Sequence, residues 1–205
     1  VGQIIPWNFP ILMAAWKLAP ALGAGNCVVL KPAEWTPLSA SFFADLTKQA
    51  GFPDGVFNVV QGFGRTAGAA LTSHKDIARI AFTGSVPTAK IIAKAAAENL
   101  TPTSFELGGK SPLVVFGDSD LDLAVDLAVE QYDNAGQVCL SGTRLLVHES
   151  IAQEFADRFR DKAMLIKQGD PRDEETAIGP QIHQVHFDRV KGFVDRAREE
   201  EIGRA

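Results

Sequence analysis

The stretch IARIAFTGSVPTAKIIAKAAAENL, residues 77–100, joins an apolar segment directly to an amphipathic one. Its first eight residues are rich in apolar side chains and stop at Gly84, which is typical of a short buried strand. Ser85 is a favourable N-cap, and Pro87 suits the first turn of the helix that follows. The stretch therefore predicts a strand that passes directly into a helix.

The same alternation continues toward the N-terminus. Thr36 is a candidate N-cap, Pro37 suits the first position of a helix, and Gly51 suits the position just past its end. Strands alternating with helices predict an α/β fold with a parallel sheet that is covered on both faces. The strands are expected at residues 27–32, 56–61 and 77–84, and the helices at 36–51 and 85–100, with a glycine-rich turn that enters a further helix within 62–74.

The pattern restarts after the motif ELGGKSP, residues 106–112. Gln153 would complete a capping box with Ser150 at the start of the last expected helix. The pair Gly108 and Gly109 marks a boundary, which predicts two domains, residues 1–108 and residues 109–205. In the second domain strands are expected at residues 113–116 and 144–147, and helices at about 121–133 and after 150.

Composition excludes several classes of function. The 205 residues are 46% hydrophobic and 22% charged, with a formal net charge of -5 and no basic cluster, so neither nucleic acid nor a membrane surface is an expected partner. Residues 1–30 carry Lys17 as their only charge, but three prolines divide them into pieces too short to span a bilayer. The expected partners are small molecules or protein.

The two cysteines, Cys27 and Cys139, have no zinc or disulfide spacing. This predicts no metal site and a reducing compartment, with the cytoplasm as the expected location. Cys27 lies in an apolar strand and is expected in the core. Cys139 lies among small residues in YDNAGQVCLSG, residues 132–142, so it is either a small core residue or a nucleophile.

Three further sites are candidates for binding or catalysis. The turn Gly84–Ser85, between a strand and a helix N-terminus, suits a phosphate, although any such turn favours glycine and serine. Lys31 and Glu34 follow a strand end and could bind ribose hydroxyls, although the residues alone favour two solvated loop charges. Glu106 lies beside Leu107 and two glycines, where a carboxylate could serve as a base.

Five motifs carry a resemblance to a known family. They are PWNFP at residues 6–10, KPAE at 31–34, FTGS at 82–85, ELGGKSP at 106–112 and GQVC at 136–139. In this order and spacing the chain resembles the middle of the aldehyde dehydrogenase superfamily, over nearly all its length. The resemblance implies a Rossmann-like parallel-sheet cofactor domain followed by part of an α/β catalytic domain.

The resemblance also implies a reaction. Cys139 would attack an aldehyde to form a thiohemiacetal, whose oxyanion would be held by the side-chain amide of Asn8 and the backbone N–H of Cys139. Oxidation would leave a thioester on Cys139, and water activated by Glu106 would release the carboxylic acid. Because members that transfer the acyl group to coenzyme A usually lack this glutamate, a non-acylating enzyme is expected.

Cofactor contacts are implied in the same way. NAD is expected over NADP, because a carboxylate at Glu34 would repel a 2'-phosphate. The sequence departs from the family at Ala89, where glycine is common, and at Arg65, where proline is frequent. The implied cofactor contacts are Ile5, Trp7, Lys31, Glu34, Gly64, Gly84, Ser85 and Leu107.

Alternatives remain open at this stage. The chain is expected to be a fragment of a longer protein that forms a homodimer or homotetramer, and 205 residues alone are not expected to turn over. A truncated, non-catalytic cofactor-binding or structural relative is the main alternative. A thiol hydrolase or acyltransferase that uses Cys139 and Glu106 without a redox step is less favoured, because it needs no adenosine site.

Overall fold

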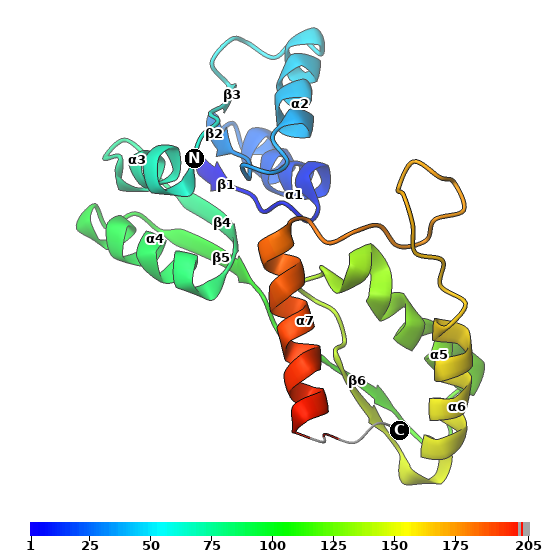
Figure 1. The fold of residues 1–205 in the computed structure, drawn as a ribbon. Coiled ribbons are helices and arrows are strands. Elements are labelled where there is room, and N and C mark those ends of the chain that lie inside the picture. The colour runs from blue at the N-terminus through cyan, green and yellow to red at the C-terminus, as the bar shows by residue number, and fades with distance from the viewer. Residues whose placement is uncertain (201, 203–205) are drawn as a thin grey trace. The chain divides into compact units, whose positions relative to one another are not determined.

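The computed structural model describes residues 1–200 and 202, and the chain divides into two compact units at Gly108 and Gly109. The first unit holds a sheet with the strand order β3-β2-β1-β4-β5, in which every pairing is parallel. Figure 1 shows helices flanking this sheet in the blue to green part of the chain. Its elements are β1 (Gly2–Ile4), α1 (Pro10–Gly23), β2 (Val28–Lys31), α2 (Leu38–Gln49), β3 (Phe57–Val59), η1 (Gly64–Gly68), α3 (Ala69–Ser73), β4 (Ile80–Gly84), α4 (Val86–Glu98) and β5 (Thr103–Leu107).

The two faces of this sheet bury separate cores, because successive side chains of a strand point to opposite faces. Helices α1 and α2 cover one face, where Ile5 packs with Leu18 and Leu30. On the other face, residues of β4 pack with α4, and Ile4 packs against this second cluster. The parallel sheet and its two covered faces, predicted from the alternating pattern, are confirmed.

The connection from β4 to α4 matches the sequence prediction. Ser85 is the N-cap of α4, its Oγ accepts a hydrogen bond from the Thr88 N–H at 3.4 Å, and Pro87 lies in the first turn. This connection places the N-terminus of a thirteen-residue helix at the carboxyl end of a central strand.

Two expectations for this unit are wrong. Thr36 does not cap α2, because its N–H closes a turn onto the carbonyl of Ala33 at 3.2 Å and the helix begins at Leu38. Cys27 is exposed rather than in the core, because it precedes β2 and lies in the connection from α1.

The second unit is built on two parallel strands that pack against two helices. Val115, Val125, Ala128 and Phe155 form its buried cluster, and Phe155 stacks on Phe159 at a centroid distance of 6.1 Å. No helix among the described residues of either unit is long and apolar enough to span a membrane. The elements are β6 (Pro112–Val115), α5 (Leu121–Val129), η2 (Glu130–Gly136), β7 (Arg144–Val147), η3 (Glu149–Ile151), α6 (Ala152–Ala163) and α7 (Gln184–Glu199).

Details at two helix ends differ from the predictions. The helix expected to run from Leu121 toward Asp133 is α-helical only to Val129, and the chain then continues as a 3-10 segment with a kink. The expected capping box is absent because His148 accepts the Ser150 N–H at 3.3 Å, whereas Gln153 donates to Asp157.

The N-cap of α5 gives a test of local stability. Asp120 accepts a hydrogen bond from the Leu123 N–H at 3.1 Å, so Asp120→Ala should lower the free energy of unfolding by about 1 kcal/mol. Urea unfolding followed by circular dichroism measures this change. Asp118→Ala, an exposed neighbour that caps no helix, is the control and should change stability by less than about 0.5 kcal/mol. Equal losses in both variants would contradict the assignment of the cap.

Candidate functional site

The carboxyl ends of the strands in the first unit meet at one edge of its sheet, because all five run parallel. The strand order reverses at β1, which pairs with β2 on one side and with β4 on the other. Open α/β sheets bind ligands beyond the carboxyl ends of the strands at such a reversal. Lys31, Gly84 and Ser85 all lie at this edge.

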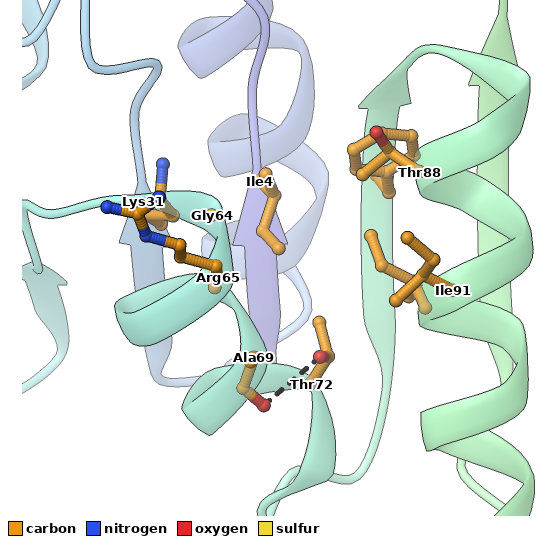
Figure 2. A pocket seen from close by; sticks show the side chains of 11 residues that line it. Ile4, Lys31, Gly64, Arg65, Ala69, Thr72, Thr88 and Ile91 are labelled. Carbon is orange, nitrogen blue, oxygen red and sulfur yellow. Dashed lines mark hydrogen bonds between the residues drawn. The ribbon is translucent and has the colours of Figure 1, made fainter.

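A pocket of about 440 Å³ opens on the α4 face of the sheet. Figure 2 shows it between α4 on one side and η1 with α3 on the other, with Ile4 projecting from β1 and Thr88 and Ile91 from α4. The wall is mainly apolar, and the charged side chains that line it are Lys31 and Arg65. The full lining is Ile4, Lys31, Gly64, Arg65, Gly68, Ala69, Thr72, Phe82, Thr88, Ile91 and Ile92.

Lys31 and Glu34 form an ion pair beside this pocket. The Lys31 Nζ lies 3.4 Å from the Glu34 Oε1 and donates to the Pro32 carbonyl at 2.9 Å, and its side chain is 3% exposed. The same Oε1 accepts a hydrogen bond from the Gly64 N–H at 2.6 Å. The two charges suggested by the sequence are therefore not independent solvated loop charges.

The pKa of Glu34 is lowered from its ordinary value. Burial is the largest single influence and would raise the pKa, but backbone hydrogen bonds, including that of Gly64, and the Lys31 ammonium together outweigh it. Because the folded pKa lies below the unfolded value, ionised Glu34 favours the folded state above the unfolded pKa. This contribution is lost as the pH falls through the folded pKa.

Gly64 begins η1, a π-helical turn that leads into α3. Such turns occur frequently at functional sites. A Cβ at Gly68 would lie 3.6 Å from the Lys31 Cδ, so the stem of Lys31 runs along this turn. One π-helical turn therefore contacts both members of the ion pair.

Gly84 and Ser85 lie at the carboxyl end of β4, at the same edge of the sheet. A Cβ at residue 84 would lie 2.5 Å from the Cζ of Phe82, which lines the pocket, so glycine is required if that ring keeps its position. The Ser85 Oγ lies 2.9 Å from the Thr88 Oγ1, and Ser85 is exposed at the N-terminus of α4. This hydroxyl and the helix dipole suit an anion.

The remaining predicted contacts occupy different surroundings. The Ile5 side chain is 2% exposed and belongs to the core under α1, which leaves its backbone as the part available to a ligand. Trp7 and Asn8 are half-buried in the connection from β1 to α1. Leu107, at the end of β5, packs against the α4-side cluster.

Glu106 lies in β5, opposite Thr83 of β4, and its side chain is exposed. It acts electrostatically on Lys17, which projects from α1. Burial lowers the pKa of Lys17 below its ordinary value, and the negative charge of Glu106 partly opposes this shift. Lys17 was not a candidate from sequence, although it is the only charged side chain in residues 1–30.

Cys139 lies in the second unit, half-buried in the loop between η2 and β7. Its carbonyl accepts a hydrogen bond from the Gly109 N–H at 3.2 Å. Just before it, Asn134, Ala135 and Gly136 have φ angles of 49°, 58° and 72°. Left-handed backbone at non-glycine residues costs about 1–2 kcal/mol each and is often found at functional sites.

Three glutamine side chains hold this strained loop in place. The Gln137 Nε2 donates to the Asn134 carbonyl at 2.9 Å, and its Oε1 accepts the Ile182 N–H at 2.9 Å. The Gln181 Nε2 donates to the Ala135 carbonyl at 3.0 Å, and the Gln131 Oε1 accepts the Gly142 N–H at 2.5 Å. Of the three glutamines, only Gln137 belongs to a motif that was singled out from the sequence, GQVC. None of the three was predicted to hold the loop in place.

Comparison with known proteins identifies what the chain is similar to. Residues 1–203 match the sequence profile described as the aldehyde dehydrogenase family. An aldehyde dehydrogenase of Emericella nidulans is 52% identical over 199 residues, which are 96% of this chain and 40% of that protein. Aldehyde dehydrogenase 2, mitochondrial, of Saccharomyces cerevisiae is 51% identical over 97% of this chain and 39% of its own length. The chain thus spans about 40% of the length of these curated relatives.

Several solved structures are also similar to this chain. HpcC from Thermus thermophilus superposes with a TM-score of 0.93 at 46% identity, over 97% of this chain and 39% of that one. PnpE in complex with nicotinamide adenine dinucleotide has a TM-score of 0.93 at 45% identity, over 98% of this chain and 41% of its own. Betaine aldehyde dehydrogenase from Staphylococcus aureus in complex with NAD+ has a TM-score of 0.93 at 41% identity, over 98% of this chain and 40% of its own.

The ion pair at the pocket gives a test by titration. Lys31→Met removes the ammonium 3.4 Å from Glu34, so the pKa of Glu34 should rise toward its ordinary value. The rise should be incomplete, because the Gly64 N–H remains a donor. The measurement is the pH dependence of the carboxylate signal of Glu34 in isotope-labelled protein. Lys48→Met, whose lysine lies near Asp54 instead, is the control, and a Glu34 pKa that stays constant in Lys31→Met would contradict the pairing.

Proposed function

The chain belongs to the aldehyde dehydrogenase family, and we propose that it carries the cofactor-binding and thiol-bearing parts of an enzyme that oxidises an aldehyde to the carboxylic acid with NAD. The observation that carries the proposal is the pocket at the carboxyl ends of the strands, where a mainly apolar cavity of about 440 Å³ adjoins the anchored Lys31–Glu34 pair. A thiol hydrolase would have no use for this pocket, so the redox reaction is the better supported function.

The residues around the pocket fit an adenine dinucleotide. The apolar wall between α3 and α4 suits an adenine ring, and Gly64 and Gly68 leave room for the ligand beside the ion pair. The Glu34 carboxylate would accept hydrogen bonds from the ribose hydroxyls, with Lys31 as a donor beside it. Ser85 and the N-terminus of α4 would hold the pyrophosphate. Ile5, Trp7 and Leu107 are proposed to lie near the nicotinamide end.

NAD is the proposed cofactor, ahead of NADP. The lowered pKa of Glu34 keeps its carboxylate ionised, and a negative charge at the ribose opposes a 2'-phosphate. Two structural relatives, PnpE and the betaine aldehyde dehydrogenase, were crystallised with NAD. When bound, NAD supplies the acceptor for the hydride that the substrate loses.

The covalent step is assigned to Cys139. Its thiolate would attack the aldehyde carbon and form a carbon–sulfur bond, while the carbonyl oxygen becomes an oxyanion. The side-chain amide of Asn8 and the backbone N–H of Cys139 would stabilise that oxyanion. Loss of a hydride from the adduct leaves a thioester on the same sulfur. The loop that carries Cys139 supports this role, because three glutamines fix its backbone.

Hydrolysis is assigned to Glu106. The carboxylate would take a proton from water, and the resulting hydroxide would attack the thioester carbon and release the carboxylic acid and the Cys139 thiolate. Exposure of Glu106 at the end of β5 supports access to water. A base for water favours hydrolysis over transfer to coenzyme A, so the enzyme is proposed to be non-acylating.

The remaining properties are proposals of the same kind. The proposed substrate is a small-molecule aldehyde, and the full protein is proposed to form a homodimer or homotetramer. The cytoplasmic location stays a prediction, since the relatives include proteins named mitochondrial from Saccharomyces cerevisiae and Homo sapiens.

The two cysteines allow a matched test of the nucleophile. Cys139→Ala in the full natural chain should lower the rate of NADH formation from an aldehyde by about a thousandfold or more, because the covalent step is lost. Cys27→Ala changes the exposed cysteine that precedes β2 and should keep most of the activity. The absorbance of NADH measures both variants. Activity retained in Cys139→Ala would remove the thiol from the mechanism.

Replacement of the proposed general base should block hydrolysis of the thioester rather than its formation. Glu106→Gln should still form the thioester but hydrolyse it slowly, so NADH should appear in a burst stoichiometric with the enzyme and then nearly stop. Intact-protein mass spectrometry should detect the acyl group on Cys139. Glu98→Gln, which changes an exposed glutamate at the end of α4, is the control and should show neither effect. Steady turnover in Glu106→Gln would contradict the assignment.

A further inference from the structure

We propose that Gln137 is a positioning residue for the Cys139 thiol, and that it acts by joining the loop before Cys139 to the chain segment that enters α7. The inference rests on the proposed covalent reaction of Cys139 and deepens it, because it says what holds the reacting group in place. Gln137 touches neither substrate nor cofactor in this proposal and acts only through the backbone of Cys139.

The side chain of Gln137 binds two different parts of the second unit. Its Nε2 donates to the Asn134 carbonyl at 2.9 Å, which is a contact within the loop. Its Oε1 accepts the Ile182 N–H at 2.9 Å, which is a contact to a residue 45 positions further along the chain. Gln137 is only 9% exposed, and a buried amide that loses its partners is costly. These contacts therefore belong to a buried network rather than to a solvated surface group.

The Ile182 side of this contact is the start of a helix. Ile182 immediately precedes His183, the N-cap of the sixteen-residue helix α7, and the His183 Nδ1 accepts the His186 N–H at 3.1 Å. The neighbouring Gln181 also contacts the loop, where its Nε2 donates to the Ala135 carbonyl at 3.0 Å. Two hydrogen bonds, one from a side chain of each segment, thus join the start of a capped helix to the loop.

The loop needs support from outside because its own backbone conformation is unfavourable. Asn134 and Ala135 are left-handed, with φ angles of 49° and 58°, and neither is glycine. The hydrogen bond from the Gln137 N–H to the Asn134 carbonyl at 3.1 Å closes a short turn, but it does not orient that turn within the unit. The contact with Ile182 supplies the orientation, because Ile182 is held at the start of α7.

The position of Gln137 is passed on to Cys139 through two peptide bonds. On the other side of the thiol, the Cys139 carbonyl accepts the Gly109 N–H at 3.2 Å, and the Gln131 Oε1 accepts the Gly142 N–H at 2.5 Å. Because the chain is held before and after Cys139, the thiol and the backbone N–H proposed for the oxyanion have fixed directions. A displacement of about 1 Å at a reacting atom can cost about a hundredfold in rate.

A purely structural role for Gln137 is the alternative, in which its hydrogen bonds only help the second unit to fold. The two roles differ in their effect on the first turnover. Loss of folded protein lowers the amount of NADH formed in the first turnover and leaves its rate unchanged. Loss of thiol position lowers the rate and leaves the amount unchanged, because every folded molecule still reacts once.

The experiment follows NADH in the first turnover by stopped-flow absorbance, in the full natural chain that carries Glu106→Gln as the reference. Adding Gln137→Met removes the two hydrogen bonds at similar side-chain volume and should lower the first-turnover rate by about a hundredfold at an unchanged amount of NADH. Adding Gln137→Glu keeps an oxygen for the Ile182 N–H and should keep the rate within about tenfold of the reference. Rates are compared on the plateau of each pH profile, so that a change in thiol ionisation does not enter.

Two further glutamines provide a control and a second variant. Gln184→Met changes an exposed glutamine of α7 that donates to Asp188 in the same helix, and it should leave rate and amount within about twofold of the reference. Gln181→Met removes the bond to Ala135 from the α7 side and should lower the rate by about tenfold. If Gln137→Met does not fold, the rate of Gln181→Met decides between the two roles.

Hydrogen exchange of the Ile182 amide, resolved by NMR, tests the contact without an aldehyde. Exchange should accelerate by about tenfold or more in Gln137→Met and stay unchanged in Gln184→Met. The inference fails if Ile182 exchange is unchanged in Gln137→Met, if that variant keeps the first-turnover rate or lowers only the amount, or if Gln137→Glu falls as far. A reference protein that forms no NADH would instead overturn the proposed oxidation, and the positioning role with it, so the two failures are distinguishable.

Discussion

The pairing of β1 with two neighbours sets the geometry of the first unit. This three-residue strand bonds to β2 on one side and to β4 on the other, in parallel register with both. Parallel pairing forces all the carboxyl ends to one edge, so residues about eighty positions apart in sequence, such as Ile4 and Ser85, both lie there. The pocket, the ion pair and the N-terminus of α4 depend on this arrangement. A slip by one residue would exchange the α4-facing Ile4 with the α1-facing Ile5.

The two units fix the positions of their candidate residues by different kinds of contact. At the sheet edge, regular hydrogen bonds of strands and the start of a helix fix positions, and the ion pair is anchored onto that frame through Gly64. In the thiol-bearing loop no regular element reaches the key residue. Side-chain amides instead bind backbone groups of a segment with left-handed φ angles, and their bonds offset the strain of that segment. Glutamine suits this task because one amide both donates and accepts.

Much of the architecture could be predicted because the sequence pattern is local. The strand and helix around Ser85 follow from apolar periodicity and capping preferences, and the family follows from motifs that are contiguous in sequence. What could not be predicted depends on contacts between distant residues. The exposure of Cys27 depends on where β2 begins, and the cap lost at Thr36 depends on a turn with Ala33. The partners of Gln131 and Gln181 are likewise set by tertiary folding, and the catalytic and cofactor roles of the residues remain predictions.

The absence of a side chain at Gly84 makes the residue tolerated at position 84 depend on the residue at position 82. A methyl group there would lie 2.5 Å from the Phe82 Cζ, and that ring is already packed edge-on against Phe105 at a centroid distance of 6.2 Å. The ring also lines the cavity, so a shift of the ring would change the shape of that cavity. Residues 82 and 84 are therefore expected to be epistatic, because a side chain at position 84 fits better beside a residue smaller than phenylalanine at position 82. A library that varies position 84 alone would meet this clash, whereas paired variation of positions 82 and 84 would reach new pocket shapes.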